Sequence, residues 1–323
     1  MVNFLQRFLA RLRELFSSPA PPGPVGQLPE PVIRRVLQIV FDPRLPSHPN
    51  QRLSSFLGWT PVDSLIQGYI QDLQTSSHGY LQYRVIDKIA VDGFPAKKDG
   101  FSYTIDEYLQ ALQNPGSQHQ PDLADYERIL ADFDVVARIN SGDFDEVWMF
   151  GMPYGGFYES IMVGPEAFFC NAPPLTHTGA NKRFLMMGFN YQRGVGEMLE
   201  AFGHRAEFIL ARTFRNTTGG ANLWSRFIRY DKSHPGRAEC GNVHFAPNSL
   251  TDYDWGNPRF VPSRCRNWAQ FADLSGAPVM VNSAEWGNGD IRKHHTWWLS
   301  LFPHFAGLSQ GIAWNWWQYV SDP

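Results

Sequence analysis

Cysteine is scarce in this chain of 323 residues, and its scarcity narrows the possible classes of protein. Only Cys170, Cys240 and Cys265 occur, and no two of them have the C-x-x-C spacing. An odd, widely spaced set of this kind argues against a disulfide framework and against a cysteine-bound structural zinc site. A single disulfide between Cys240 and Cys265 stays open, so the sequence leaves the redox compartment undetermined.

Long hydrophobic runs and an excess of charge are also absent. No stretch reaches the roughly 18 consecutive apolar residues that a membrane-spanning helix needs. The formal net charge is only −3, which gives no reason to expect nucleic acid as a partner. The chain has no phosphate-binding P-loop and no H-E-x-x-H zinc motif. With 43% hydrophobic and 15% aromatic residues it nevertheless has the composition of a globular protein.

The first residues differ in character from the remainder. Apolar residues recur at helical spacing over residues 1–16, with Arg7, Arg11 and Arg13 between them. This pattern predicts a basic amphipathic helix, and the arginines interrupt the apolar centre that a signal peptide would need. Two interpretations stay open. The segment is either a helix packed on its own domain (or an artefactual start), or a helix that contacts a membrane surface.

A proline-rich segment separates this helix from the rest of the chain. Residues 17–31 cannot hold a helix or an inner strand, so we predict a semi-rigid linker there. We therefore expect a single α/β domain over residues 32–323. Localisation is left open between the cytoplasm and the periphery of a membrane.

Apolar runs alternate with helical patterns throughout the predicted domain. The runs that we predict as strands lie at 36–41, 80–91, 146–150, 183–189, 242–245, 279–281 and 311–314. The helical patterns lie at 61–74, 105–113, 126–133 and 194–212. This alternation predicts an α/β fold with a mostly parallel sheet, for which we prefer a (β/α)-barrel over an open doubly wound sheet. An eighth strand could come from 205–210 or 135–139.

Polar and aromatic side chains stand at the ends of these predicted strands. Both candidate architectures bind ligands at the carboxyl ends of parallel strands. The candidate site residues are therefore those at the strand ends: Asp42, Asp92, Tyr154, Asn190, His244, Glu285 and Trp314.

The last two of these strand ends resemble a known family. Glu285 ends an apolar run and is followed by Trp286 and Gly287, and the next apolar run leads to Trp314 and Asn315. This arrangement is similar to the final two strand–loop units of barrel-type retaining glycoside hydrolases. The resemblance implies a barrel in which Glu285 is the strand-seven nucleophile and a strand-eight tryptophan lines the sugar site.

Hydrolysis of a glycosidic bond needs two carboxyl groups, one on each side of that bond. Glu285 is the first candidate, as nucleophile or base. Glu159 is the second, as the acid, because it follows a predicted strand in a segment rich in glycine and tyrosine. Trp286 and Trp314 are expected to stack on the sugar. The plainer alternatives are a turn carboxylate at 285 and a solvated loop residue at 159.

A third set of polar residues lies on the longest predicted helix. Glu197, Glu200 and His204 share one face there, because their spacings of three and four match the helical repeat. Glu197 is a rival to Glu159 as the acid. Glu200 and His204 could instead chelate a divalent metal ion together with His244. An ordinary salt-bridged helix surface is the plain alternative.

The sequence favours a hydrolase that acts on a glycan or glycoconjugate through a carboxylate pair and needs no cofactor. One alternative is a metal-dependent hydrolase that holds a divalent ion with Glu200, His204 and His244. The other is a membrane-attached glycan-binding protein without catalytic activity. The partner is in each case a carbohydrate or small molecule. The residues expected to bind and orient it are Tyr154, Asn190, His204, His244, Trp286, Trp314 and Asn315.

Overall fold

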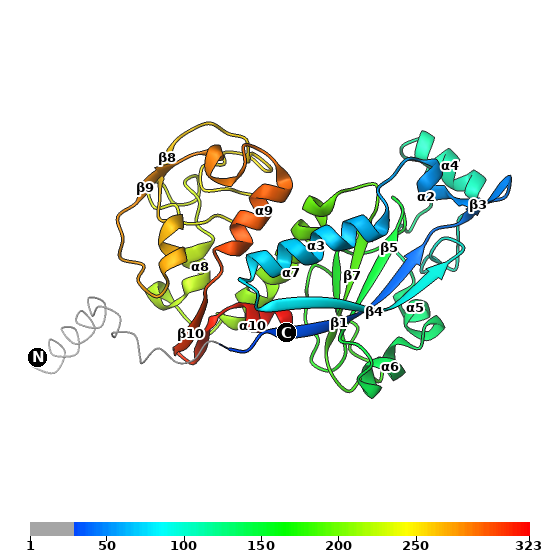
Figure 1. The fold of residues 1–323 in the computed structure, drawn as a ribbon, viewed down its shortest axis with the longest axis horizontal. Coiled ribbons are helices and arrows are strands. Elements are labelled where there is room, and N and C mark those ends of the chain that lie inside the picture. Colours follow the sequence, from blue (N-terminus) through cyan, green and yellow to red (C-terminus); the bar gives the residue numbers. More distant parts are fainter. Residues whose placement is uncertain (1–28) are drawn as a thin grey trace, which may run out of the picture.

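A central five-stranded sheet organises the computed structural model, which describes residues 29–323. The strands are β1 (Val32–Phe41), β4 (Leu81–Val91), β5 (Glu146–Gly151), β6 (Ser160–Val163) and β7 (Phe184–Asn190). They lie side by side in the order β4-β1-β5-β7-β6 (Figure 1). All neighbouring pairs are parallel except β6 with β7, which are antiparallel at one edge of the sheet.

The side chains of β5 show that the sheet is buried on both faces. All six residues of this strand are buried. Val147 and Met149 belong to one hydrophobic core, whereas Trp148 and Phe150 belong to the other. Because successive side chains of a strand point to opposite faces, a continuous apolar run of this kind marks a central parallel strand covered on both sides.

Helices cover the two faces of the sheet. Helices α5 (Tyr126–Asp132) and α6 (Val135–Ser141) pack on one face. Helices α3 (Val62–Ser76) and α7 (Val195–Thr213) lie along the other, and α9 (Ile291–Ser300) packs against both of them (Figure 1). The remaining short elements around the sheet are β2 (Arg44–Leu45), β3 (His48–Arg52), α2 (Leu53–Phe56) and α4 (Ile105–Gln113), and the 3₁₀ turn η1 (Gly219–Ala221) follows α7.

Glycines in α7 let other elements approach this helix closely. A Cβ at Gly196 would lie 2.5 Å from a side-chain carbon of Ile291 in α9. A Cβ at Gly203 would lie 2.7 Å from a side-chain carbon of Val243. Glycine weakens a helix by about 1 kcal/mol relative to alanine, and the close packing at both positions offsets that cost. Helix α7 is therefore the surface on which a second part of the chain is assembled.

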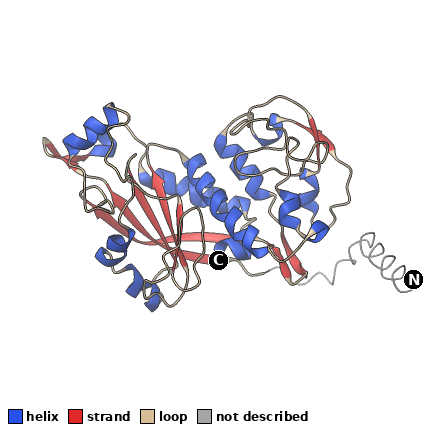
Figure 2. Cartoon of the chain, turned by 180° about the vertical axis from the view of Figure 1, so that it is seen from behind, coloured by secondary structure: helices blue, strands red, loops and turns tan. Residues whose placement is uncertain are grey.

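This second part is a separate lobe, visible beside the sheet in Figure 2. We call residues 222–316 the C-terminal lobe and residues 29–213 the sheet lobe. Besides α9, the C-terminal lobe contains α8 (Leu223–Phe227), β8 (Val261–Ser263), η2 (Cys265–Gln270), β9 (Val279–Val281), η3 (Ser283–Trp286), β10 (His304–Ser309) and β11 (Ile312–Asn315). Helix α10 (Trp317–Ser321) then returns the chain to α7, where Arg205 donates a hydrogen bond of 2.7 Å to the carbonyl of Val320.

Aromatic side chains fill the interior of the C-terminal lobe. They are all buried and meet mainly edge to face, with ring centroids between 4.8 and 6.3 Å apart. The members of this cluster are Trp224, Phe227, Trp268, Trp298, Phe302 and Trp316. The abundance of tryptophan in this half of the chain therefore serves packing, and the same core continues onto one face of the sheet.

The structure confirms the predicted α/β fold with a mostly parallel sheet. Over residues 29–323 that sheet is open, with β4 and β6 at its edges, so the preferred barrel is replaced by the open alternative. The segments 135–139 and 205–210, considered as an eighth strand, are helical. The strands predicted at 279–281 and 311–314 lie in two-stranded antiparallel sheets outside the main one.

Several other features bear on the sequence predictions. The predicted helix at 1–16 and most of the predicted linker at 17–31 lie outside the described residues, and β1 begins at Val32. Within residues 29–323, no helix combines the length and the hydropathy needed to cross a bilayer. All three cysteines are buried and free, so Cys240 and Cys265 are not paired.

Candidate functional site

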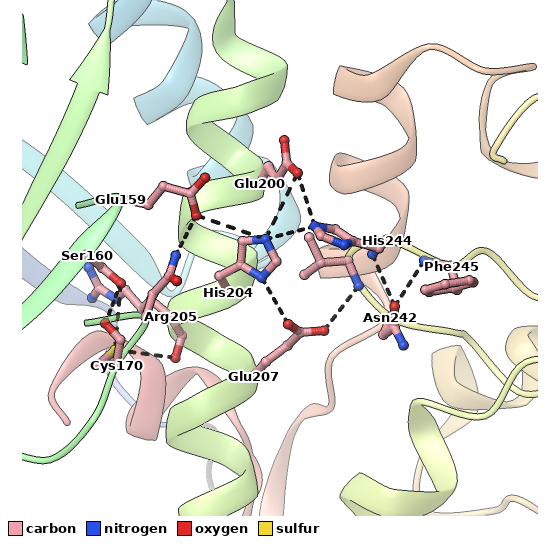
Figure 3. A network of polar contacts seen from close by, with 12 residues as sticks. Glu159, Ser160, Cys170, Glu200, His204, Arg205, Glu207, Asn242, His244 and Phe245 are labelled. Atoms are coloured by element: carbon pink, nitrogen blue, oxygen red, sulfur yellow. Dashed lines mark hydrogen bonds and ion pairs between the residues drawn. The ribbon is translucent and has the colours of Figure 1, made fainter. Parts of the chain in front are cut away.

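Two segments from different lobes meet at the candidate site (Figure 3). Glu200 and His204 lie one turn apart on α7, as their spacing predicted. His244 comes from a turn in the C-terminal lobe. There the side chain of Asn242 accepts hydrogen bonds from the backbone N–H groups of His244 and Phe245 at 3.1 and 2.9 Å. This local bonding explains why the segment forms a turn and not the predicted strand.

The donor atoms of Glu200, His204 and His244, which we call the Glu–His–His group, lie close together. Nε2 of His204 is 3.0 Å from Nε2 of His244. Oε1 of Glu200 is 3.3 Å from His244 Nε2 and 4.0 Å from His204 Nε2. Ligands of a tetrahedral zinc ion, bound at about 2.1 Å, lie about 3.4 Å from one another. The three donor atoms thus have separations suited to a single metal ion.

Each histidine also contacts a carboxylate through its other ring nitrogen. His204 Nδ1 lies 3.1 Å from Glu207, and His244 Nδ1 lies 3.1 Å from Asp252. Both contacts favour a proton on Nδ1, which leaves the Nε2 lone pairs of the two rings facing each other. Two such lone pairs repel at 3.0 Å unless a cation or a shared proton lies between them. Metal-ligating histidines almost always have a partner of this kind on the other ring nitrogen.

The pKa shifts of the group show its preference for positive charge. The hydrogen bond to Glu200 raises the pKa of His244 above its ordinary value, although burial opposes this. Burial would lower the pKa of His204, but the bond to Glu207 and the nearby glutamate charges raise it. Burial would raise the pKa of Glu200, yet hydrogen bonds from His244 and Tyr253 hold it below its ordinary value. A divalent cation would experience the same field.

Two further side chains border the Glu–His–His group. Glu159 has a carboxylate oxygen 4.0 Å from Nε2 of His204. The Tyr253 hydroxyl donates a hydrogen bond of 3.0 Å to Glu200 Oε1 and lies 3.1 Å from His244 Nε2. Burial and the hydrogen bond to Glu200 raise the pKa of Tyr253 to about 12. Tyr253 is 51% exposed and Glu159 is partly exposed, so solvent reaches the group from their side.

A cavity of about 290 Å³ opens beside Glu159. It lies beyond the carboxyl ends of β5 and β7 and at the start of α7, where sheets of this kind bind ligands. Four residues predicted from the sequence line it together: Tyr154, Glu159, Asn190 and Glu197. Glu197 also accepts a hydrogen bond of 3.0 Å from the backbone N–H of Gly194 and so caps α7. Glu159 borders both the cavity and the Glu–His–His group, so it is the residue that the two have in common.

Other predicted residues lie outside this site. Glu285 forms a two-point ion pair with Arg266, at 3.0 and 2.7 Å, in the C-terminal lobe. Trp286, Trp314 and Asn315 are all more than nine-tenths buried, so neither indole presents a free face to a sugar. These four side chains are not brought together with Glu159.

The two aspartates predicted at strand ends do lie at the carboxyl edge of the main sheet. Asp42 accepts hydrogen bonds from the backbone and the hydroxyl of Ser54, at 3.1 and 2.6 Å. Asp92 accepts one of 2.7 Å from the backbone of Arg44. Both carboxylates therefore hold the segment that follows β1, and neither belongs to the cavity lining.

Two residues of the site, Glu207 and Tyr253, are not among those predicted from the sequence. Glu207 lies three positions after His204 on the same helix face, so its spacing could have identified it. Tyr253 gives no such signal, because its position depends on the path of the loop after His244.

Comparison with known proteins gives no independent guide to this site. No protein-family model matches the chain, and neither the curated proteins nor the solved structures contain a significant match.

Proposed function

We propose that the protein is a metal-dependent hydrolase in which Glu200, His204 and His244 hold a divalent ion. One observation carries this proposal: each histidine has its Nδ1 next to a carboxylate and its Nε2 directed at the other histidine. Two histidines and a glutamate form the ligand set of several zinc hydrolases, in which a fourth position is left for water or substrate. The donor set and its separations support zinc as the ion.

The chemistry that we propose is hydrolysis of an amide or ester bond. A bound zinc ion lowers the pKa of its water to about 7 and polarises a carbonyl oxygen. In this proposal Glu159, whose carboxylate oxygen lies 4.0 Å from His204 Nε2, would accept a proton from the attacking water as the water oxygen bonds to the carbonyl carbon. It then returns this proton to the leaving nitrogen or oxygen as the bond to the carbonyl carbon breaks.

The cavity provides the proposed substrate position. Its lining combines the polar side chains of Tyr154, Asn190 and Glu197 with the backbone of two glycines, Gly155 and Gly156. A lining of this kind suits a substrate rich in hydroxyl groups, so we retain a glycan or glycoconjugate as the substrate class. An acyl group carried by such a substrate would reach the Glu–His–His group past Glu159.

The test combines metal analysis with activity measurements. Zinc content is measured after exposure to zinc and gel filtration, for the wild type and for His244→Ala. The exposed His48 in β3 supplies the matched control, His48→Ala. We expect one zinc ion per chain in the wild type and the control, and a loss of zinc in His244→Ala. Equal zinc binding by His244→Ala would contradict the proposal.

Activity is then assayed on aryl esters, N-acetylated sugars, peptides and chromogenic glycosides. We expect turnover to stop with EDTA and to return with added zinc. Turnover that is indifferent to EDTA would contradict the proposal. Glu285→Gln in the same assays tests the nucleophile that the sequence resemblance implies.

A second candidate is hydrolysis by a carboxylate pair without a metal. The observation that favours it is that Glu159 and Glu197 line the same cavity. This mechanism predicts turnover of a glycoside that is indifferent to EDTA and abolished by Glu197→Gln. The metal mechanism predicts the opposite response to EDTA, so the same assays separate the two.

A further inference from the structure

We propose that the phenolic oxygen of Tyr253 is a fourth ligand of the metal ion, and that it leaves the ion when substrate binds. The inference rests on the proposed function, because it needs an ion held by the Glu–His–His group. It adds a residue that neither the sequence pattern nor the donor set of Glu200, His204 and His244 contains. It also specifies how the resting site differs from the site during turnover.

The distances support four ligands around one point. Tyr253 Oη lies 3.0 Å from Glu200 Oε1 and 3.1 Å from His244 Nε2. The three contacts within the Glu–His–His group are 3.0, 3.3 and 4.0 Å. Together these are five of the six edges of a tetrahedron, and they cluster around the edge of about 3.4 Å expected for tetrahedral zinc.

The backbone of Tyr253 adopts a strained conformation that holds the residue beside Glu200 and His244. Its φ is +58°, in the left-handed region that residues other than glycine seldom occupy. The backbone N–H of Tyr253 donates a hydrogen bond of 3.2 Å to the carbonyl of His244. Its ring lies 4.5 Å from the His244 ring and 5.2 Å from that of Trp255. Such strain concentrates at functional sites, where surrounding contacts impose it.

The side chain of Tyr253, in contrast to its backbone, is open to solvent on one side. Tyr253 is 51% exposed, and the neighbouring Leu250 and Asp252 are exposed as well. Leaving the ion would therefore expose only part of a ring that is already half in solvent. In this proposal the Tyr253 hydroxyl would release its proton to solvent on binding the ion, and would take up a proton again as a substrate carbonyl oxygen replaced it. The neutral hydroxyl can then donate a hydrogen bond to the oxyanion that forms on that carbonyl.

Copper(II) provides a spectroscopic probe, because a copper-bound phenolate gives an intense charge-transfer band in visible light. The full chain is loaded with copper(II), and the bound metal is quantified before spectra are recorded. We expect the band in the wild type and in the control Tyr80→Phe, and its loss in Tyr253→Phe with copper still bound. Resonance Raman excitation within the band is expected to show phenolate ring modes in the wild type, a measurement that needs no variant. Acetohydroxamate, a small carbonyl chelator, is expected to bleach the band while copper stays bound.

The outcomes distinguish the inference from the proposed function. If the wild type binds copper through the Glu–His–His group, so that His204→Ala loses it, but shows no phenolate band, the fourth ligand is wrong and the metal site stands. A band that persists with saturating acetohydroxamate would overturn the displacement step. If the wild type binds no copper and no zinc, both the metal site and its fourth ligand are wrong.

Discussion

The sheet lobe is held together by a regular ladder of parallel strands and by long helices, whereas the C-terminal lobe depends on aromatic packing and on side chains that bond to loop backbone. In the C-terminal lobe, Trp298 donates to the carbonyl of Gly241 at 3.0 Å. Asn248 donates to the carbonyls of Asn257 and Arg259 at 2.8 and 2.7 Å. A lobe with so little regular structure satisfies its buried backbone groups through such side chains.

The two lobes contribute to the site in ways that follow from this difference. Helix α7 supplies Glu200 and His204 at a fixed spacing, which any sequence with a helical pattern would give. The C-terminal lobe supplies His244 and Tyr253 from a loop whose shape depends on packing around it. A site shared in this way works only when both lobes are folded and in contact, so changes in either lobe should have distinguishable effects.

The largest effect is expected from emptying the aromatic core. Trp298→Ala should reduce the free energy of unfolding by about 3–5 kcal/mol, the usual cost of truncating a buried tryptophan. It should also weaken zinc binding, because Trp298 bonds to Gly241 at the base of the turn that carries His244. Denaturant unfolding and zinc titration measure the two effects.

Trp148→Ala in β5 is the matched variant in the sheet lobe. Its indole is equally buried and donates to the carboxylate of Glu146 at 2.9 Å, not to the turn that carries His244. It should lose a similar free energy of unfolding but leave the zinc affinity of the folded molecules unchanged. Equal losses of zinc affinity in both variants would show that the lobes do not act separately on the site.

Removal of a metal ligand is expected to have the next largest effect. His204→Ala and His244→Ala should each weaken zinc binding by more than about 100-fold, because the loss of even an outer-shell partner costs 10–100-fold. Isothermal titration calorimetry gives the affinities, and circular dichroism confirms that both variants fold. If His204→Ala lost zinc affinity and His244→Ala did not, α7 alone would supply the ligands and the C-terminal lobe would supply none.

Acid should weaken zinc binding to a comparable extent. Both histidines must be neutral to bind zinc, and their pKa values are raised above the ordinary 6.5, so protons compete from near neutral pH downward. Between pH 7.5 and 5.5 the affinity should fall on the order of 100-fold.

The raised pKa values of His204 and His244 make the metal-free protein more stable at acidic pH, the opposite of their effect on zinc binding. The stabilisation from these two histidines is full below their unfolded-state pKa and disappears as the pH rises through their folded-state pKa values. Thermal melts at several pH values, with and without zinc, test both directions of pH dependence, that of zinc binding and that of the stability of the metal-free protein. Parallel profiles for the two forms would show that His204 and His244 do not bind the ion.

The smallest effect is expected from the carboxylates that orient the histidines. Glu207→Gln should weaken zinc binding near the upper end of 10–100-fold, and Asp252→Asn near the lower end. Glu207 is anchored by the backbone N–H of Val243 at 3.2 Å, whereas Asp252 is more than half exposed. Zinc titrations of the two variants at one pH provide the comparison. A larger loss of zinc affinity in Asp252→Asn than in Glu207→Gln would show that the carboxylate on the loop supports its histidine more strongly than the carboxylate on α7 does.

Prediction from the sequence succeeded best where the signal was local. The helix at 105–113 has the predicted bounds, and its first turn carries a capping box between Thr104 and Glu107. The central strands followed from their apolar runs, and the residues at their ends, Tyr154 and Asn190, do line the cavity. The runs before Glu285 and Trp314 looked the same, yet they form small antiparallel sheets. A short apolar run specifies extended chain but not its partner strand.

The sequence by itself determined that Glu200 and His204 stand on one face of a helix, because the helical repeat fixes the directions of side chains four positions apart. Only the tertiary structure decided that His244, 40 positions beyond His204, completes the group. That contact depends on Gly203, which leaves room for Val243 against α7, and on the aromatic core that holds the turn in place. Helical periodicity acts over a few residues, whereas the meeting of two lobes depends on the packing of many distant side chains, which no local pattern records.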